Sequence, residues 1–406
     1  MKPNEKIYDE VLKWVEKNTR PPLHVQIVPT NFCNIACIFC WRVWEQEDSK
    51  KKHLIDRIPD ERYIQIVNEI CENPKLRPKS VTITGGGEPM IKKELIVKMI
   101  EKIKQYNIHC EIVTNGTLFD EETVKKLIES RLDNIRISIN AASSKLADFL
   151  YGKKGSYEKT IKSMEILKKM KKKMKSEVPI IANTIVVTKY NYLEIPKMVR
   201  QASKYDVKTV NVRWVSEPYC KGKPGPLTMP PEKYEEFINT FEEAKQLAKK
   251  FNISLVSDFT LEDLRRYLQL DKNEDNKQLF VKNNPNEQNK ENSILEFIQD
   301  ENAYEKLCKI GICTFPFHEL FIDANGYASG CGTLASAGGI EENVAEDVLG
   351  KNIKEIWYGE RLNHLRVHML LREFFKTCGS CNVINIVKMS REWKEKYEKN
   401  LNNSRS

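Results

Sequence analysis

Short apolar runs alternate with amphipathic stretches in the first half of the chain. The six runs cover residues 24–30, 80–87, 110–116, 134–140, 180–187 and 209–215. Between them, apolar residues recur with the spacing of a helix, as in 59–72, 91–106 and 120–130. Strands that alternate with helices predict a parallel sheet with right-handed crossovers. Six units are fewer than the eight of a closed barrel, so we expect an α/β fold with a partial (β/α)6 TIM-like barrel.

The alternation within two runs predicts what the sheet encloses. In the run 134–140, isoleucines occupy every second position, and Arg136, Ser138 and Asn140 occupy the positions between them. Asn211 and Arg213 alternate with valines in the same way. Both faces of a parallel sheet are usually covered. These side chains therefore predict a polar cavity inside the barrel, with a sheet solvated on one face as the alternative.

The pattern changes after residue 230. A helix is predicted to begin after Pro231, and the Asn/Lys-rich residues 271–293 predict an excursion that is either a lid or disordered. Residues 318–331 predict a hairpin with its turn at Asn325-Gly326, and residues 352–375 predict one helix. We expect five parts: an N-terminal helix (1–24), the partial barrel (25–230), a helical linker with the excursion (231–305), a small α+β domain (306–385) and a C-terminal tail (386–406).

Composition and charge narrow the class of protein. With 40% hydrophobic and 30% charged residues, the 406-residue chain is typical of globular proteins. No apolar run approaches the roughly 18–20 residues of a membrane span, and the charged N-terminus predicts an amphipathic helix, not a signal peptide. We therefore expect a cytoplasmic protein. Much of the +9 net charge lies in residues 168–175, where interleaved methionines predict a solvated lysine face and not a nucleic-acid site.

Eleven cysteines in a cytoplasmic chain favour metal binding or catalysis over disulfides. Cys33, Cys37 and Cys40 form a CxxxCxxC triplet directly after the first predicted strand. Three thiolates can hold three irons of a [4Fe–4S] cubane and leave the fourth iron open to a substrate. A zinc site completed by His24 or His53 and three unrelated buried thiols are the alternatives.

The segment TGGGEP follows at 84–89, where the second predicted strand ends. Its glycines let the backbone approach a ligand closely. The triplet and this segment, in this order and on consecutive strands, resemble the radical S-adenosylmethionine (SAM) enzymes over roughly residues 25–217. The resemblance implies that the open iron binds the methionine part of SAM. It also implies that one electron cleaves SAM to a 5′-deoxyadenosyl radical, which abstracts a hydrogen atom from the substrate.

The resemblance also implies which residues contact SAM. The glycines are expected at the amino group, with Glu88 ending their motif, and an aromatic near the adenine. Two strand residues are expected near the ribose or methionine, although these and the aromatic also suit structural roles. The residues are Gly85, Gly86, Gly87, Glu88, Phe39, Ser138 and Asn183.

Two positions depart from the pattern of the relatives. Asn140 stands where relatives often have Asp, and Tyr151 stands where many have the Arg that binds the carboxylate of SAM. Lys153, Lys154 or Arg136 is then expected to supply that positive charge.

A second set of cysteines, Cys313, Cys331, Cys378 and Cys381, resembles the twitch domain, which is a short form of the SPASM auxiliary-cluster domain. The resemblance implies a second, auxiliary [4Fe–4S] cluster whose four thiolate ligands saturate it, so that it handles electrons. Zinc suits the spacing of these four cysteines as well. Cys308 stays open between three roles: a ligand that replaces one of the last two cysteines, a hydrogen-atom donor, or an ordinary buried thiol.

The function expected first is a two-electron oxidation of a small polar molecule, such as a sugar or an aminocyclitol, with the auxiliary cluster as electron acceptor. The alternative is a peptide- or protein-modifying maturase or epimerase, with Cys308 as hydrogen donor; only about 24 residues precede the first strand, too few for an N-terminal peptide-binding domain. A non-catalytic iron–sulfur or zinc protein is the alternative of another class. The expected electron donor is a flavodoxin or ferredoxin. The conceivable proton acceptors are Glu217, Asp258, His318 and Asp323.

Overall fold

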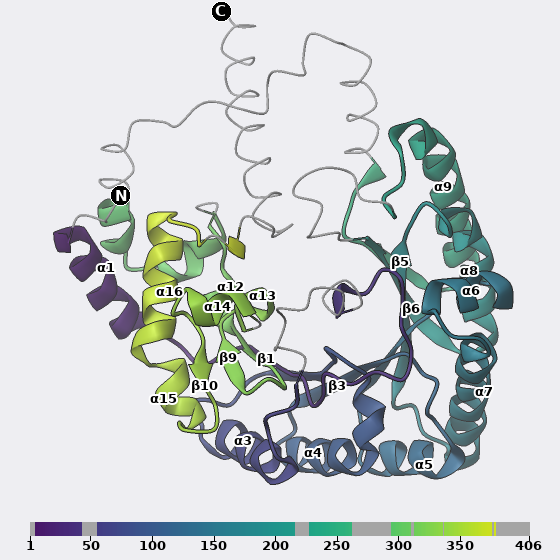
Figure 1. The fold of residues 1–406 in the computed structure, drawn as a ribbon, viewed down its shortest axis with the longest axis horizontal. Coiled ribbons are helices and arrows are strands. Elements are labelled where there is room, and N and C mark those ends of the chain that lie inside the picture. The colour runs from purple at the N-terminus through teal and green to yellow at the C-terminus, as the bar shows by residue number, and fades with distance from the viewer. Residues whose placement is uncertain are drawn as a thin grey trace, which may run out of the picture.

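The computed structural model describes residues 5–42, 55–215, 227–261, 294–309, 312–335, 337–375 and 377–378 (Figure 1). Within them, one ten-stranded sheet has the order β10-β9-β8-β1-β2-β3-β4-β5-β6-β7. The six predicted strands are parallel neighbours in chain order, which confirms the predicted partial barrel. They are β1 (His24–Ile27), β2 (Ser80–Ile83), β3 (His109–Thr114), β4 (Asn134–Ser138), β5 (Ile180–Val187) and β6 (Val207–Trp214).

Further strands extend this sheet at both ends. β7 (Ser254–Ser257) pairs in parallel with β6, and β8 (Glu319–Ile322) pairs in parallel with β1. β9 (Tyr327–Ser329) and β10 (Glu346–Asp347) continue it with antiparallel pairs. β8 and β9 form the predicted hairpin, and Gly326 in its turn has a φ of +93°, a conformation that favours glycine. The C-terminal strands therefore continue the core sheet, and the domain boundaries stay a prediction.

The helices follow one another along the outer side of the curved sheet (Figure 1). In α4, buried apolar residues recur three or four positions apart, from Leu95 to Ile103, so one stripe of the helix packs on the sheet. The helices of this layer are α3 (Asp60–Glu72), α4 (Lys93–Gln105), α5 (Glu121–Glu129), α6 (Ser144–Tyr151), α7 (Ser156–Met174), α8 (Ile195–Lys204) and α9 (Tyr234–Lys250).

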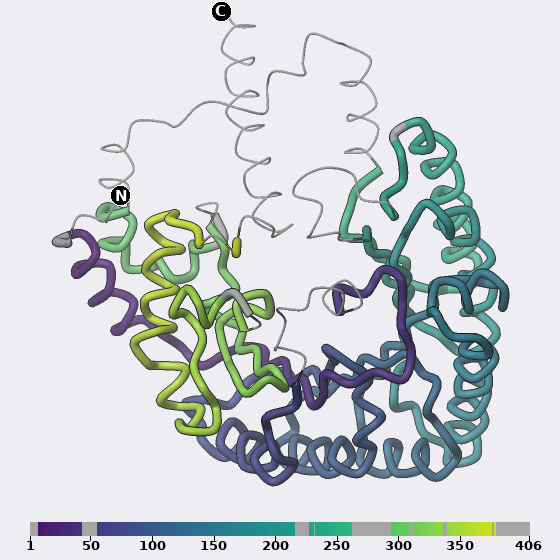
Figure 2. The backbone as a smooth tube through the Cα atoms, in the orientation of Figure 1, coloured from purple at the N-terminus to yellow at the C-terminus, as the bar shows by residue number. Residues whose placement is uncertain are grey.

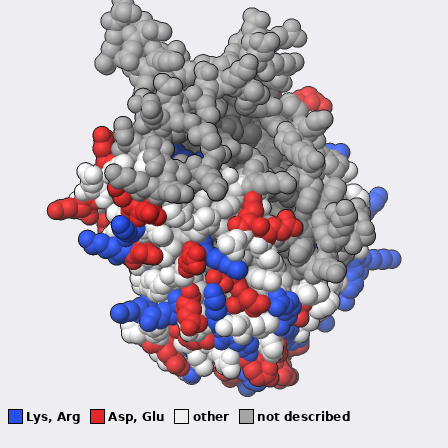
Figure 3. All heavy atoms as spheres, turned by 60° about the vertical axis from the view of Figure 1, so that its left-hand side comes forward, with Lys and Arg blue, Asp and Glu red and all other residues white. Residues whose placement is uncertain are grey.

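The lysine-rich stretch forms the second half of α7. Met164, Leu167 and Met170 are buried, whereas Lys172 and Lys173 are exposed, which confirms the solvated lysine face. On a different face of the molecule, shown in Figure 3, basic and acidic side chains are interspersed. Within the described ranges, every helix is too short or too polar to span a bilayer.

The N-terminal helix α1 (Glu5–Asn18) lies beside the last described helix, α16 (Glu360–Leu371), as Figure 2 shows. The hydroxyl of Tyr8 lies 2.6 Å from Nδ1 of His364 across this contact. The prediction of one helix over 352–375 is wrong, because α15 (Ile353–Trp357) ends before α16 begins. Gly359 separates them with an extended backbone. The remaining short helices are α12 (Phe315–His318), α13 (Gly332–Ala335) and α14 (Ala337–Glu341).

Candidate cofactor site

The three cysteines of the triplet lie on the segment that leaves the carboxyl end of β1. The backbone of this segment is fastened to α6: Ala36 N donates to Tyr151 O at 3.0 Å, and Ile38 N donates to Leu150 O at 3.0 Å. Burial raises the pKa of the Cys37 thiol well above its usual value, and the neighbouring charges of Cys40 and Cys33 raise it further. Such thiols deprotonate readily only beside positive charge. The donor set therefore fits an iron–sulfur cluster, whose irons would supply that charge.

A zinc site at the triplet fits less well. Within the described ranges, no set of three or more His, Cys, Asp or Glu side chains is placed to hold a single metal ion. His24 begins β1, at the opposite end of the strand from the triplet, and its Nδ1 lies 2.8 Å from Ser80 Oγ. His53 lies outside the described residues. Each thiolate of a cubane binds a different iron, so the three thiols need not converge on one point.

Gly85, Gly86 and Gly87 pack against the residues that precede Cys33. Gly87 N donates to Thr30 O at 2.9 Å, and Glu88 N donates to Phe32 O at 2.8 Å. A Cβ on Gly86 would lie 2.2 Å from Asn31 Oδ1, and one on Gly87 would lie 1.9 Å from Phe32 O. Gly87 therefore requires glycine, because it touches the backbone of Phe32, whereas a Cβ on Gly86 would displace the Asn31 side chain. The structure thus places the glycine segment directly beside the start of the triplet.

Glu88 joins the carboxyl end of β2 to that of β3. Its Oε1 accepts hydrogen bonds from Thr114 Oγ1 at 2.6 Å and Met90 N at 3.0 Å, and its Oε2 accepts one from Asn115 N at 2.7 Å. The side chain is 2% exposed, and burial raises its pKa while the two backbone N–H groups and the Thr114 hydroxyl oppose that rise. Both oxygens are therefore engaged within the protein, and Glu88 holds the strand ends together.

Sequence reasoning missed Asn115, which follows β3. Its Nδ2 lies 2.9 Å from Asn34 Oδ1 and 3.9 Å from Cys33 Sγ. The signal was the Asn-Gly pair at 115–116, which ends the third run. A polar residue at the carboxyl end of a strand adjacent to β2 is placed to meet a ligand there.

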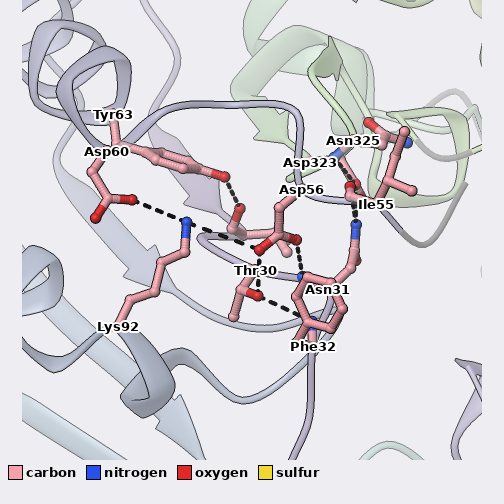
Figure 4. A network of polar contacts seen from close by, with 11 residues as sticks. Thr30, Asn31, Phe32, Ile55, Asp56, Asp60, Tyr63, Lys92, Asp323 and Asn325 are labelled. Carbon is pink, nitrogen blue, oxygen red and sulfur yellow. Dashed lines mark hydrogen bonds and ion pairs between the residues drawn. The ribbon is translucent and has the colours of Figure 1, made fainter.

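A buried polar network holds the segment before the triplet to the C-terminal hairpin (Figure 4). Asp56 accepts hydrogen bonds from Thr30 Oγ1 at 2.6 Å and from Asn31 N at 2.7 Å. The Asn31 amide donates to Ile55 O at 3.2 Å and to Asp323 Oδ1 at 3.4 Å. Asp323 Oδ1 also accepts from Asn325 N at 2.9 Å. The glycine segment, the triplet and the β8–β9 turn are therefore held as one unit.

The four conceivable proton acceptors lie in different places. Asp323 lies in the network just described and is 4% exposed. The Asp258 carboxylate accepts from Trp214 N at 3.0 Å, next to β7. His318 directly precedes β8, at the edge of the sheet opposite to the triplet. Glu217 lies outside the described residues.

The other expected SAM contacts are distributed over both faces of the sheet. Phe39 packs against the buried cluster of Ala147 and Leu150 on α6. Ser138 ends β4 on its half-exposed inner face. Asn183 pairs with Ile137 on the outer, helix-covered face, whereas Thr184 lines the cavity inside the sheet, and the role of Asn183 as a SAM contact stays a prediction. Strand alternation decides the face, because neighbouring residues point to opposite faces.

The two positions that depart from the family pattern have structural partners. The Tyr151 hydroxyl donates to Ser138 O at 3.3 Å and accepts from Asn140 N at 3.0 Å. Asn140 Oδ1 accepts from Val186 N at 2.7 Å. Lys153 Nζ donates to Asn34 O at 2.7 Å, within the triplet segment.

A polar cavity of about 400 Å³ lies inside the curved sheet, which confirms the predicted polar interior. Arg136 forms a 2.6 Å ion pair with Glu111 in its wall. Burial lowers the pKa of His24, so this ring is neutral near pH 7. The lining residues are His24, Gln26, Ser80, Thr82, Thr84, His109, Glu111, Val113, Arg136, Thr184 and Arg213. Two guanidinium groups therefore face one carboxylate, and the cavity reaches Thr84, next to the glycine segment.

Three cysteines of the second set line one small apolar cavity in the C-terminal part. Cys313, Cys331 and Cys378 share it with side chains of α12, α13 and α16, among them Leu365 and Met369. The described cysteines form no disulfide. Cys381 and the side chain of Cys308 lie outside what the structure describes, as do residues 271–293 and the C-terminal tail.

Comparison with known proteins agrees with this arrangement. The sequence profile of the Radical SAM superfamily matches residues 27–202. PqqA peptide cyclase of Granulibacter bethesdensis is 24% identical over 182 residues, which are 45% of this chain and 44% of that protein. The probable GTP 3′,8-cyclase of Pyrococcus horikoshii is 29% identical over 190 residues, which are 47% of this chain and 55% of that protein. The chain spans about half the length of these curated relatives.

Two solved structures share the fold over most of the chain. Streptococcus suis SuiB bound to the precursor peptide SuiA has a TM-score of 0.59 at 18% identity, covering 94% of this chain and 73% of that chain. Native anSMEcpe with bound AdoMet and Kp18Cys peptide has a TM-score of 0.54 at 20% identity, covering 89% of this chain and 87% of that chain. At such identities the likeness concerns the fold alone.

Proposed function

The chain belongs to the radical SAM superfamily, and on that premise we propose that it modifies a peptide or protein segment by hydrogen abstraction. Its cofactors are a [4Fe–4S] cluster and SAM. The observation that carries the proposal is the meeting of the triplet and the glycine segment at the carboxyl edge of the sheet. Ligands of parallel α/β folds bind at this edge.

When bound, the cluster and SAM together supply the 5′-deoxyadenosyl radical that abstracts the hydrogen atom. The chain supplies the binding geometry. Cys33, Cys37 and Cys40 would hold the cluster, and Gly85–Gly87 would offer backbone groups to the amino group of SAM. The backbone bonds from Gly87 N to Thr30 O and from Glu88 N to Phe32 O keep the two segments in contact. Arg136 remains a candidate for the SAM carboxylate, although its ion pair with Glu111 places it deeper in the cavity.

The comparisons favour a peptide over the small molecule that the sequence predicted. One curated relative is named for a peptide, and two solved structures of this fold hold one. The cavity adds a chemical preference. Burial raises the pKa of Glu111 against the opposing effect of Arg136. Whether Glu111 is charged or neutral, the cavity wall keeps a net positive charge from Arg136 and Arg213. A substrate segment with a carboxylate suits it.

We place an auxiliary cluster at the C-terminal cavity, held by Cys313, Cys331, Cys378 and, by spacing, Cys381. The support is that three of these four thiols line one cavity. Its apolar wall would keep water from the cluster, which suits electron transfer. The cluster would then accept the electron left on the substrate in an oxidation.

Anaerobic reconstitution with iron and sulfide tests the proposal. The reduced protein should convert SAM to 5′-deoxyadenosine, and a peptide encoded beside the gene should gain a cross-link or deuterium from D2O. Mass spectrometry separates these outcomes, since cross-linking removes two hydrogens and epimerisation in D2O adds one deuterium. Protein that binds only zinc and never cleaves SAM contradicts the proposal.

A second candidate function is the dehydrogenation of a small polar molecule. The polar cavity of about 400 Å³ favours it, since its volume is typical of a small-molecule pocket. Sugars or aminocyclitols that raise 5′-deoxyadenosine formation, when peptides do not, support this candidate instead.

A further inference from the structure

An exposed apolar patch lies on the outer side of α6 and on the loop after β5. Phe149 is 49% exposed, Tyr190 is 43% exposed and Leu193 is 50% exposed. The rings of Phe149 and Tyr190 meet edge to face, with centroids 5.2 Å apart. Aromatic side chains at a protein surface are typical of binding sites. We call Lys145, Phe149, Lys189, Tyr190 and Leu193 the α6 patch.

The patch lies directly behind the cysteine triplet. The inner side of α6 contacts the triplet segment through the backbone bonds of Ala36 and Ile38, and Cys37 packs on the same helix. A Cβ on Gly152, where α6 ends, would lie 2.3 Å from Ala36 O. One helix, about 10 Å across, therefore separates the patch from the site of the cluster.

The charges of the patch are basic. Lys145 lies one helical turn before Phe149, on the same side of α6. Lys189 Nζ lies 5.2 Å from the centroid of the Tyr190 ring. Two neighbouring carboxylates bind backbone groups: Glu194 accepts from Ala142 N at 2.7 Å, and Asp148 Oδ2 accepts from Gly155 N at 2.9 Å. Two lysines therefore flank the aromatic pair, and a partner with acidic groups complements them.

We propose that the α6 patch docks a small acidic electron-transfer protein that reduces the cluster. This inference rests on the proposed function, which requires one electron for each SAM cleaved. The donor protein loses that electron and the cluster gains it, and no bond or proton is exchanged between the two proteins. The lysines steer the acidic partner, and the aromatic pair provides the apolar contact.

The test uses the reconstituted enzyme and a flavodoxin as the probe. The variant K145E/K189E reverses two charges of the patch. The matched control K172E/K173E makes the same change of charge on the exposed face of α7. We expect K145E/K189E to bind flavodoxin at least about tenfold more weakly at low salt. The control should bind like the wild type, and Phe149→Ala should weaken binding without changing its salt dependence.

Two reductants, flavodoxin and dithionite, distinguish a failure of the docking proposal from a failure of the proposed function. With reduced flavodoxin, K145E/K189E should form 5′-deoxyadenosine at least about tenfold more slowly, and with dithionite it should match the wild type. Equal flavodoxin affinity for the patch variant and the wild type overturns the docking proposal, as does equal weakening in the control. A wild type that fails to cleave SAM with dithionite overturns the proposed function, while the binding comparison still decides the patch.

Discussion

The two cysteine sites of this protein have opposite surroundings. The triplet lies at the polar carboxyl edge of the sheet, where Asn31, Asp56 and Glu88 bind backbone groups of neighbouring segments. The C-terminal cysteines line an apolar cavity beside Leu365 and Met369. A site that receives a charged ligand needs backbone and polar groups close to it, whereas a site that only transfers electrons gains from the exclusion of water. The difference supports the proposal that SAM binds at the first site.

The largest effect is expected when the triplet is removed. The variant C33A/C37A/C40A should lose SAM cleavage, and its iron should fall from about eight to about four per chain. The control Cys71→Ala changes a buried cysteine that lines neither site, and it should keep all the iron. Iron analysis and chromatography of 5′-deoxyadenosine measure both quantities. Retained SAM cleavage in the triple variant would contradict the proposal that the triplet holds the cluster that binds SAM.

The reverse variant, Cys331→Ser, should spare SAM cleavage. We expect about four irons per chain and 5′-deoxyadenosine formation near that of the wild type, with loss of the modified product. The measurement pairs iron analysis with mass spectrometry of the product. If Cys331→Ser abolishes SAM cleavage while the protein stays folded, the two sites are not separable in function.

Gly86→Ala tests whether the packing of the glycine segment matters for SAM binding. The added Cβ would lie 2.2 Å from Asn31 Oδ1, so either the Asn31 amide, which binds Ile55 O and Asp323, or the glycine segment must shift. We expect SAM affinity to fall at least about tenfold, or 1.4 kcal/mol, with the iron content unchanged. Gly350→Ala is the control, since a Cβ there meets nothing within 4 Å. Titration of the reconstituted protein with SAM measures the effect, and equal affinities in the two variants contradict the packing argument.

Of the two cysteine sites, Leu365→Ala should affect only the C-terminal one. Leu365 is fully buried against the cysteine cavity, so its truncation should cost about 2–5 kcal/mol of unfolding free energy. Leu127→Ala, at a buried position of α5, should cost a similar amount. Only Leu365→Ala should make the auxiliary cluster more sensitive to oxygen, measured as the bleaching of its absorbance in air. Equal bleaching rates would show that the apolar wall does not protect it.

The regular alternation along the first 217 residues predicted the six central strands and the polar cavity. The cysteine and glycine motifs predicted which segments meet at the sheet edge, because both lie where a predicted strand ends. These features depend on local pattern, which a sequence displays.

The features that were missed depend on contacts between distant residues. β8 pairs with β1 across almost 300 positions of the chain, and no local sequence pattern predicts that pairing. The face of Asn183 is an exception, because its alternation with Ile181 and Ile185 already places it on the covered face. The ion pair of Arg136 with Glu111, and the bond of Asn31 to Asp323, appear only when the strands are side by side.

The most direct test of which cluster binds SAM is electron paramagnetic resonance of single-cluster variants, with and without SAM. On the proposed assignment, Cys331→Ser should keep only the triplet cluster, and C33A/C37A/C40A should keep only the auxiliary cluster. We predict that SAM changes the spectrum of reduced Cys331→Ser and leaves that of the reduced triple variant unchanged. A spectrum of Cys331→Ser that ignores SAM, or a triple variant whose spectrum responds to it, would contradict the assignment of the open site.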